Sequence, residues 1–215
     1  MRKILCILLF CCLGLISKAQ FIDSLQSAIE KKGSFSFNVD SRDSYIDNNL
    51  AYIFGFSVGV CFDKKITIGG GINILASTIS SIKYTGGDTL KGKLKFSYIS
   101  YFAEYTMALT KHWTLDFPVY IGIGSSSYQY TNKTEIVIAS NKIIMPLEPQ
   151  VELDYNFNKY VGLYTQVGYR YMLVNKTLLG YDFNSVTYSV GMLIAPLQIY
   201  AGLFPHSKLA RMIED

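Results

Sequence analysis

Apolar and polar residues alternate with a period of two through most of this chain, and the clearest run is WTLDFPVYIGIG at residues 113–124. Its odd positions, from Trp113 to Ile123, are all apolar, whereas its even positions are Thr, Asp, Pro, Tyr or Gly. This period predicts a β-strand with two different faces. The run has 12 residues, whereas an ordinary strand has about five or six and a tilted membrane-crossing strand needs about nine to eleven. We therefore expect this strand to cross a membrane as part of a barrel.

The same alternation predicts a series of strands joined by turns and loops. The nine predicted strands are residues 35–39, 50–62, 66–74, 96–109, 113–124 (extending to 128), 145–157, 160–173, 185–195 and 197–204. Short turns are expected near residues 64, 111, 159 and 196, a polar link at 41–49, and longer loops at 77–93, 130–141 and 174–184. Short connections at one end and long ones at the other are typical of outer-membrane barrels.

These elements predict an all-β fold, an antiparallel up-and-down transmembrane β-barrel of about eight strands, with ten as the alternative. Each strand pairs with the next, because the connections leave no room for crossover helices. Bacterial single-chain barrels have even numbers of strands, so one of the nine runs is peripheral or a tenth strand is hidden. We favour including the strand at 35–39, since it would carry the chain up before the strand at 50–62 descends.

Composition favours strands over membrane helices. The chain of 215 residues contains 17 Tyr and 13 Phe, and half of its residues are hydrophobic. Aromatic residues are enriched in strands. After residue 20 no run approaches the roughly 18 apolar residues that a membrane helix requires. One domain of ordinary size accounts for this length.

The two ends of the chain differ from the alternating region. Residues 1–19 read as a signal peptide, with Arg2 and Lys3 before an apolar segment and a small residue, Ala19, at the cleavage position. A helical membrane anchor is the alternative. Residues 20–33 predict a short amphipathic leader helix, the barrel occupies residues 34–204, and residues 205–215 form a polar tail.

Charge and cysteine content exclude several classes of protein. The formal net charge is +4, but the predicted signal peptide holds three of the basic residues, which leaves 17 basic against 16 acidic residues. The sequence contains no basic patch with interleaved aromatic residues, which is the pattern typical of nucleic-acid binding. Cys61 is the only cysteine beyond the signal peptide, so no intramolecular disulfide is expected.

The alternation also assigns residues to the barrel lumen. The more apolar face meets lipid, and the other face points inward. The predicted lumenal polar cluster, a candidate contact for an ion or ligand, consists of Glu104, Asp116, Glu148, Gln150, Glu152, Asp154, Gln166 and Arg170. If Phe157 pairs with Val161 across a three-residue loop, Glu148 lies opposite Arg170 and Glu152 lies opposite Gln166.

Three interpretations of this cluster stay open at the level of sequence. The charges fill a narrow interior with ion pairs, since buried charges must be paired. Alternatively, they form a lumen that prefers cations or binds a ligand. The third possibility is an acid–base pair for hydrolysis, which requires a defined carboxylate separation around an open cleft.

No catalytic, metal or cofactor motif accompanies the cluster, and we expect no enzymatic activity. His112 falls in a short turn and His206 in the tail, so neither is placed to activate a serine in the lumen. No pair of Cys or His residues has the spacing of a metal site. We therefore expect no catalytic residues, no metal and no cofactor.

Aromatic residues next to the predicted turns and loops are candidates for the membrane interface, where Trp and Tyr are enriched. These are Trp113, Tyr128, Tyr130 and Tyr160. Packing in the interior is the alternative.

The chain also resembles a known group of proteins. The residues that carry the resemblance are the Ala-Gln at the end of the signal peptide, DSRDSYI at 40–46, FGF at 54–56 and IGGGIN at 68–73. With this pattern of alternation, glycines and aromatics, the chain is similar to uncharacterised outer-membrane β-barrel proteins of Bacteroidota. The resemblance implies the fold and an outer-membrane location, and it carries no chemistry onto particular residues.

The expected function is that of an outer-membrane barrel with a structural, interaction or narrow-channel role. Its expected partner is outer-membrane lipid, with no nucleic acid, and we expect a monomer. The alternative is a soluble secreted or periplasmic barrel, lipocalin-like, that binds an apolar ligand. A lipid-modifying outer-membrane enzyme is disfavoured because no histidine is expected in the lumen.

Overall fold

The structure is a computed structural model that describes residues 25–46, 49–85, 88–132, 135–178, 181–204 and 206. The predicted signal peptide, the start of the leader helix and all of the tail except His206 lie outside the described residues. The strands are β1 (Gly33–Ile46), β2 (Asn49–Phe62), β3 (Ile66–Leu75), β4 (Ser80–Thr85), β5 (Asp88–Ala108), β6 (Trp113–Asn132), β7 (Glu135–Asn156), β8 (Val161–Val174), β9 (Thr177–Leu178), β10 (Tyr181–Asp182) and β11 (Ser185–Ile194), and helix α2 spans Pro196–Leu203.

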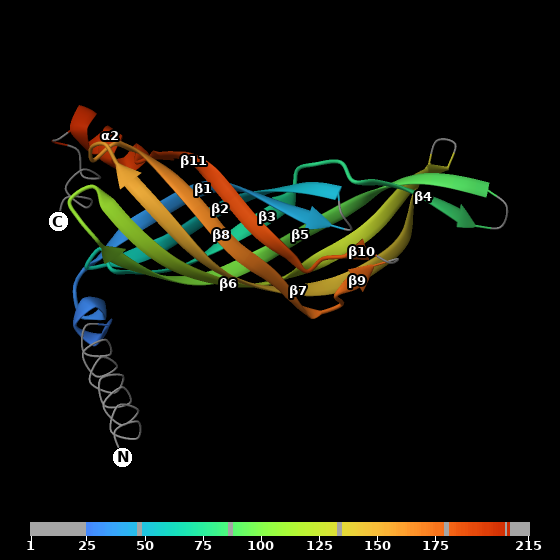
Figure 1. Cartoon of the computed structure of the whole chain (residues 1–215), viewed down its shortest axis with the longest axis horizontal. Helices are drawn as coiled ribbons and strands as arrows, with labels where there is room; N and C mark the ends of the chain where they lie inside the picture. Colours follow the sequence, from blue (N-terminus) through green and yellow to red (C-terminus); the bar gives the residue numbers. More distant parts are fainter. Residues whose placement is uncertain are drawn as a thin grey trace, which may run out of the picture.

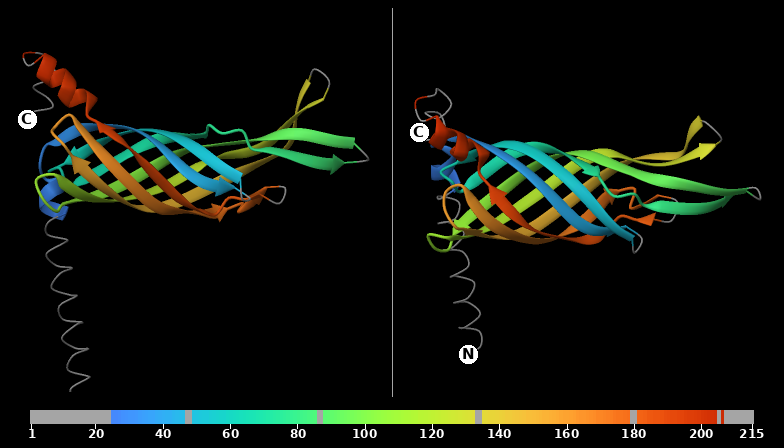
Figure 2. Two further views of the ribbon diagram at one scale, coloured as in Figure 1. Left: turned by 45° about the horizontal axis from the view of Figure 1, so that its top comes forward. Right: turned by 90° about the horizontal axis from the view of Figure 1, so that it is seen from above.

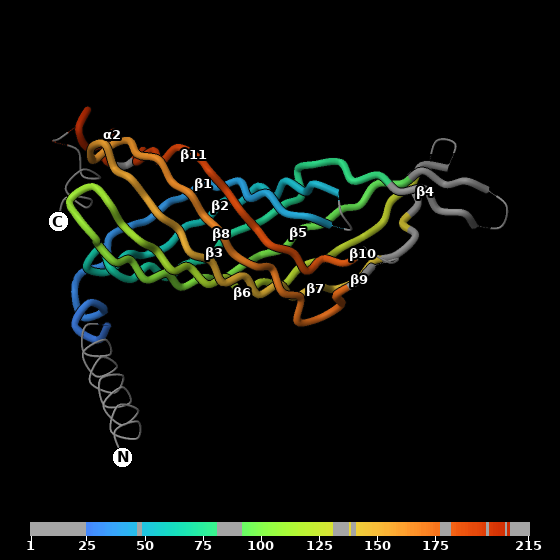
Figure 3. The backbone as a smooth tube through the Cα atoms, viewed as in Figure 1, coloured from blue at the N-terminus to red at the C-terminus, as the bar shows by residue number. Residues whose placement is uncertain are grey.

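Eight of these strands form a closed antiparallel ring, as the sequence predicted. The ring runs through β1, β2, β3, β5, β6, β7, β8 and β11, and β11 pairs with β1 to close it. The register at the closure places Asp43 opposite Tyr188 and Ser44 opposite Thr187. Figures 1 and 3 show the resulting up-and-down barrel, with its strands tilted to the long axis. Strand β4 pairs only with β5 beyond the ring, and β9 and β10 form a separate two-stranded hairpin.

One end of the barrel carries tight turns and the other carries long hairpins. The turn at residues 63–65 has positive φ angles at Asp63 and Lys64. At the opposite end β5, β6 and β7 have 21, 20 and 22 residues, about twice the length that a membrane crossing needs. Figure 2 shows the hairpins β4–β5 and β6–β7 projecting beyond the barrel.

Three predictions of irregular structure are therefore wrong. The predicted loops at 77–93 and 130–141 are mostly the paired strands of these hairpins, and the predicted link at 41–49 is largely the continuation of β1 to Ile46. Polar residues at these positions indicated loops. A hairpin beyond the membrane-spanning part can, however, be polar on one face, or on both faces where both are exposed to solvent. The predicted loop at 174–184 also contains the short pair β9–β10.

The predicted strand at 197–204 is also wrong, because this segment is helix α2. Pro196 occupies the first turn of the helix, where its missing N–H costs nothing, and the backbone N–H of Ile199 donates to the carbonyl of Ala195. A ninth strand also has no free edge to join, since β11 already pairs with β8 on one side and β1 on the other. With this run removed, the even strand number of eight follows.

At the N-terminus, residues 25–29 are helical, within the predicted leader at 20–33, and Gly33 already begins β1. Lys31 follows this helix and forms an ion pair of 2.6 Å with Asp63 in the β2–β3 turn. The hydrogen bond from Lys31 lowers the pKa of the Asp63 carboxyl. This segment and α2 both lie at the short-turn end (Figure 1). Among the described residues, no helix is long and apolar enough to cross a membrane.

The outer surface of the ring is an apolar belt, defined as the outward-pointing rows of Val, Ile, Leu, Phe and Tyr on its strands. On β6 the belt runs from Trp113 to Ile123 and is followed by the outward residues Ser125 and Ser127. On β5 the change occurs at the same level, because Ile99 pairs with Ile123 and Ser97 pairs with Ser125. The 11 residues from Trp113 to Ile123 match the length that a membrane crossing requires.

A charge placed within the belt should therefore destabilise the barrel. We expect Val119→Arg, at the middle of the β6 row, to cost about 2–4 kcal/mol of folding free energy in lipid. The matched change Ser125→Arg, one outward position beyond the belt, should cost about 0–1 kcal/mol. Reversible denaturant unfolding in phospholipid vesicles measures both values, and equal costs would contradict the position of the belt.

Candidate functional site: the barrel lumen

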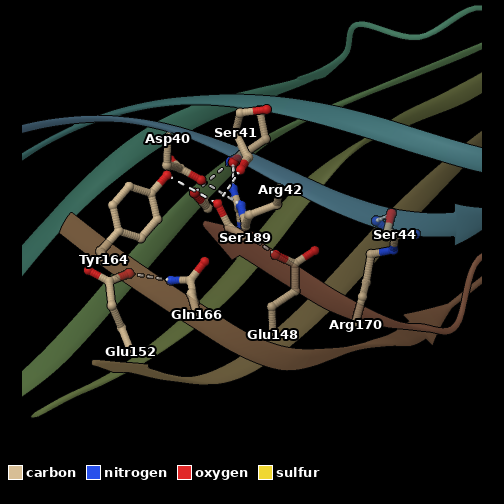
Figure 4. A network of polar contacts seen from close by, with 12 residues as sticks. Asp40, Ser41, Arg42, Ser44, Glu148, Glu152, Tyr164, Gln166, Arg170 and Ser189 are labelled. Atoms are coloured by element: carbon tan, nitrogen blue, oxygen red, sulfur yellow. Dashed lines mark hydrogen bonds and ion pairs between the residues drawn. The ribbon is translucent and has the colours of Figure 1, made fainter. Parts of the chain in front are cut away.

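Arg42 lies at the centre of the lumen, on the inner face of β1, with only 2% of its surface exposed. Its Nε lies 2.7 Å from Asp40 Oδ2, its Nη1 donates to Glu148 and its Nη2 donates to Asn73. The guanidinium also stacks on Tyr120, 5.1 Å from the ring centroid. Two carboxylates thus neutralise one buried cation, and Figure 4 shows Glu148 of β7 reaching toward Asp40 and Arg42 of β1.

Further hydrogen bonds extend this centre across the barrel. Tyr98 on β5 donates its hydroxyl to Glu148 Oε1 at 2.9 Å, and the amide of Asn73 on β3 donates to Ser100 Oγ at 2.9 Å. The Tyr98 ring lies against Gly122 on β6, where a Cβ atom would come within 2.6 Å of it. We define Arg42, Glu148, Asn73, Ser100 and Tyr98 as the central network, which joins β1, β3, β5 and β7.

Arg170 is fully buried but is not the counterion that the sequence predicted. The pairs Leu147–Tyr171 and Gln150–Gly168 fix a register that places Glu148 opposite Arg170, and Glu152 pairs with Gln166 directly, as predicted. The Arg170 side chain instead donates to the carbonyl of Phe183 at 2.8 Å and to Ser44 Oγ at 3.1 Å. Its guanidinium covers the Phe96 ring. Glu148 is bound by Arg42, so the expectation that the carboxylates gather around Arg170 is wrong.

The half of the lumen nearer the long hairpins is filled by a hydrophobic core. The core is built from side chains of six strands, β1, β2, β3, β5, β7 and β8. Phe183, in the connection between β10 and β11, also packs into it. Its members are Ile46, Ala51, Ile53, Leu75, Ile79, Leu94, Phe96, Tyr98, Ile144, Met172 and Phe183. The core and the central network together fill this half and the middle of the lumen with packed side chains, as expected for a barrel of eight strands.

The half nearer the short turns holds a cavity of about 290 Å³, which we call the acidic cavity. Four of the predicted lumenal carboxylates line it, namely Glu104, Asp116, Glu152 and Asp154. Tyr120 belongs to its wall and stacks beneath Arg42, so the central network lies at its inner end. Lys159 and Tyr160 of the β7–β8 turn line its opposite end, so the cavity lies next to the rim of the barrel.

The eight predicted polar residues thus all lie on the inner face, but in separate groups. Glu104, Asp116, Glu152 and Asp154 share the acidic cavity, and Gln166 donates to Glu152 Oε2 at 2.8 Å (Figure 4). Glu148 and Arg170 lie farther toward the long hairpins. Gln150 is buried between the two groups on β7, and neither atom of its amide has a hydrogen-bond partner. A role for any of them in binding stays a prediction.

Four members of the central network, namely Arg42, Asn73, Ser100 and Tyr98, are absent from the lumenal cluster that the sequence predicted. Arg42 fell in the predicted link at 41–49, although Asp40, Arg42 and Ser44 continue the inward row of the first strand with the same period of two. That period was the available signal, and the density of polar residues concealed it. Asn73, Ser100 and Tyr98 lie within predicted strands but carry no charge that marks them as candidates.

Histidine is absent from the described lining of the acidic cavity. Neither His112 nor His206 lines the acidic cavity. His112 is exposed in the β5–β6 turn, where its Nδ1 lies 2.8 Å from the carbonyl oxygen of Asn156. The expectation of no enzymatic activity stays a prediction, and the geometry supplies no histidine that would oppose it.

The four candidate interface aromatics occupy different environments. Trp113 is exposed at the short-turn end, 4.8 Å from the ring of Tyr155, and Tyr160 lies under Lys159 Nζ at 5.0 Å. Tyr130 is half-buried on the β6 extension. Tyr128 is 1% exposed and packs over Gly92, so its predicted interface position is wrong. It points to the inner side of the hairpins, and glycine provides the space for its ring.

Comparison with known proteins identifies the fold. No protein-family model matches the chain, and no curated protein sequence matches it. Among solved structures, Neisserial surface protein A (NspA) aligns with a TM-score of 0.53 at 12% identity, covering 76% of this chain and 99% of NspA. The described residues therefore adopt the fold of the small outer-membrane β-barrels.

Two further solved structures align less closely. Ail, the attachment invasion locus protein of Yersinia pestis, in complex with the heparin analogue sucrose octasulfate, has a TM-score of 0.48 at 11% identity and covers 75% of this chain and 97% of its own. The N-terminal β-barrel domain of Pseudomonas aeruginosa OprF has a TM-score of 0.43 at 14% identity, with the same two coverages. The resemblance to Bacteroidota proteins stays a prediction.

Removing one partner of the central network should destabilise the barrel strongly. Arg42→Met leaves Glu148 and Asp40 without their cation, and we expect a loss of about 3–5 kcal/mol. The double variant Arg42→Met/Glu148→Met removes one of the two orphaned carboxylates and should recover part of that loss. Denaturant unfolding of the wild type, both single variants and the double variant measures the coupling, and strictly additive effects would contradict it.

Proposed function

We propose that this protein spans the bacterial outer membrane as a closed, non-conducting barrel and acts through the hairpins that it presents at the cell surface. The observation that carries the proposal is the combination of a filled lumen with hairpins β4–β5 and β6–β7 that extend beyond the apolar belt. If the lumen is closed, a partner can reach only the rim of the barrel and its hairpins. The proposed role is therefore structural or interactive.

The apolar belt supports the membrane location. Its outward residues include Phe54, Ile72 and Val119, each 44–49% exposed. Monomeric soluble proteins rarely expose contiguous apolar patches larger than a few hundred Å², and this belt encircles the ring. In a membrane the apolar belt contacts lipid chains instead of water. The closed ring also leaves no unpaired sheet edge in the lipid.

The filled lumen supports a closed barrel over a narrow channel. Arg42, Arg170, Glu148 and Phe183 are each at most 2% exposed, and they belong to adjoining layers of the interior. An ion that crossed would have to separate the Arg42–Glu148 pair and then enter the hydrophobic core. Both steps are costly. The first leaves buried charges without a partner, and the second places an ion in an apolar interior that cannot replace its hydration.

The lipocalin-like alternative fits these features less well. A soluble barrel that binds an apolar ligand needs an apolar cavity inside and a polar surface outside. Here the outward rows are apolar, and the cavity is lined by four carboxylates. NspA is a surface protein by name. At 12% identity the likeness supports the fold alone, so a surface role for this chain is part of the proposal.

The proposed orientation rests on a general feature of outer-membrane barrels, in which short turns face the periplasm and long connections face outward.

The lysines near the two ends allow a matched test. Lys93 is exposed on the β5 extension, and Lys111 is exposed in the β5–β6 turn. We expect Lys93→Cys, in a Cys61→Ser background, to react with a membrane-impermeant maleimide on intact cells, whereas Lys111→Cys should react only after the outer membrane is permeabilised.

Two results would contradict the proposal in different ways. Labelling of Lys111→Cys but not Lys93→Cys on intact cells would reverse the orientation. If both variants required permeabilisation and the protein were recovered without detergent, it would be a soluble periplasmic protein.

A further inference from the structure

The acidic cavity contains a group of three carboxylates, Asp116 on β6 and Glu152 and Asp154 on β7, that we define as the carboxylate triad. One oxygen from each side chain lies within 4.8 Å of the others. The strand register creates this proximity, because Asp116 pairs with Glu152, and Asp154 follows on the same inward row of β7. Glu104 adds a fourth carboxylate to the same cavity.

Neutral side chains donate hydrogen bonds to only some of the carboxylate oxygens in the triad. Gln166 donates to Glu152 Oε2 at 2.8 Å, and Thr114 donates to Asp154 Oδ2 at 3.5 Å. Thr106 on β5 lies directly across the strand pair from Asp116. The remaining oxygens, Asp116 Oδ1 and Asp154 Oδ1, are buried without a hydrogen-bond partner, although the two residues are only 5% and 9% exposed. Polar atoms buried at this level ordinarily have a partner.

The basic side chains around the cavity are engaged elsewhere. Arg42 is bound by Asp40 and Glu148, and Arg170 contacts Ser44 and Phe183 on the far side of the central network. Lys159 is exposed at the rim, with its Nζ over the Tyr160 ring. No ion pair that the structure gives for the described residues reaches the triad. Buried carboxylates require a cation from the protein or a bound metal, or else they are neutralised by protons.

We propose that the carboxylate triad binds a divalent cation, Ca²⁺ by preference, inside the half of the barrel nearer the short turns. A group made only of oxygen donors suits hard cations such as Ca²⁺ and Mg²⁺. Calcium lies about 2.3–2.6 Å from each oxygen, so two ligands of one ion can be as much as about 5 Å apart, whereas magnesium requires about 2.0–2.1 Å. The triad oxygens all lie within 4.8 Å of one another, so they fit around one such ion. Three carboxylates favour calcium, because magnesium usually keeps several waters and is bound by one or two carboxylates.

The surroundings agree with this assignment. The neutral donors Gln166 and Thr114 orient Glu152 and Asp154 while leaving oxygens free, which is how outer-shell groups commonly fix metal ligands. Water within the cavity can complete the six to eight oxygens that calcium takes. The site lies next to the rim, so an ion can reach it without passing the central network. This inference does not depend on the surface role proposed above.

The test uses the full mature chain folded in detergent micelles, stripped of metal with a chelator. Tb³⁺ serves as the first probe, because its emission is sensitised by nearby tyrosine and Tyr120 lines the cavity. We expect saturable emission with one site per chain, displaced by Ca²⁺ and more weakly by Mg²⁺. Added Ca²⁺ should also raise the midpoint of thermal unfolding in proportion to the logarithm of its concentration.

Two matched variants assign the site. Asp116→Asn/Asp154→Asn should weaken Tb³⁺ binding at least tenfold and abolish the thermal shift with Ca²⁺. The control Asp63→Asn removes a carboxylate in the exposed turn and should leave both readouts unchanged.

Three results would overturn the proposal, and the first needs no variant. If the wild type gives neither saturable emission nor a shift with Ca²⁺, protons rather than a metal neutralise the triad. Binding that survives in the double variant would also overturn it, as would binding that is lost in Asp63→Asn. If the double variant does not fold, Glu152→Gln replaces it with the same expectation.

Discussion

A strand in hydrocarbon must pair every backbone N–H and C=O group within the protein, and this requirement controls the whole structure. The pairing of β11 with β1 satisfies it by removing the last free edges of the sheet. Once the ring is closed, each strand has one face toward the outside and one toward the lumen. The apolar belt, the central network and the acidic cavity are all consequences of that division.

The small circumference of eight strands then determines what the lumen can contain. Side chains from opposite walls meet, so charged residues on the inner face are buried whether or not they have a function. Arg42 illustrates one solution, since two carboxylates and an amide surround it. The carboxylate triad illustrates the opposite case, in which several like charges meet without a cation from the protein. The cation proposed for that site would supply the missing charge.

The alternation of residues along the sequence was sufficient for the closed barrel and the faces of its strands, because the side-chain period of a strand is a local property. It correctly placed Glu152 opposite Gln166, since the tight turn after Phe157 fixes the register of β7 and β8. It could not identify Arg42 as the partner of Glu148. These residues are 106 positions apart and meet only because the ring closes across β1 and β11.

The remaining errors share one physical cause, which is that a local pattern does not show what surrounds a segment. The segment at 197–204 alternates like a strand but has no sheet edge to join, so it forms α2 after Pro196. Tyr128 was expected at the membrane interface but is buried on the inner side of a hairpin that the sequence did not reveal.

The most direct test of a closed barrel is the conductance of the purified protein in planar lipid bilayers, compared with the variant Arg42→Ser/Phe96→Ala/Phe183→Ala. This variant removes large side chains from both the central network and the hydrophobic core. We expect that the wild type gives no steady channel openings and that the variant conducts. Steady single-channel currents from the folded wild type would contradict a lumen closed by these side chains.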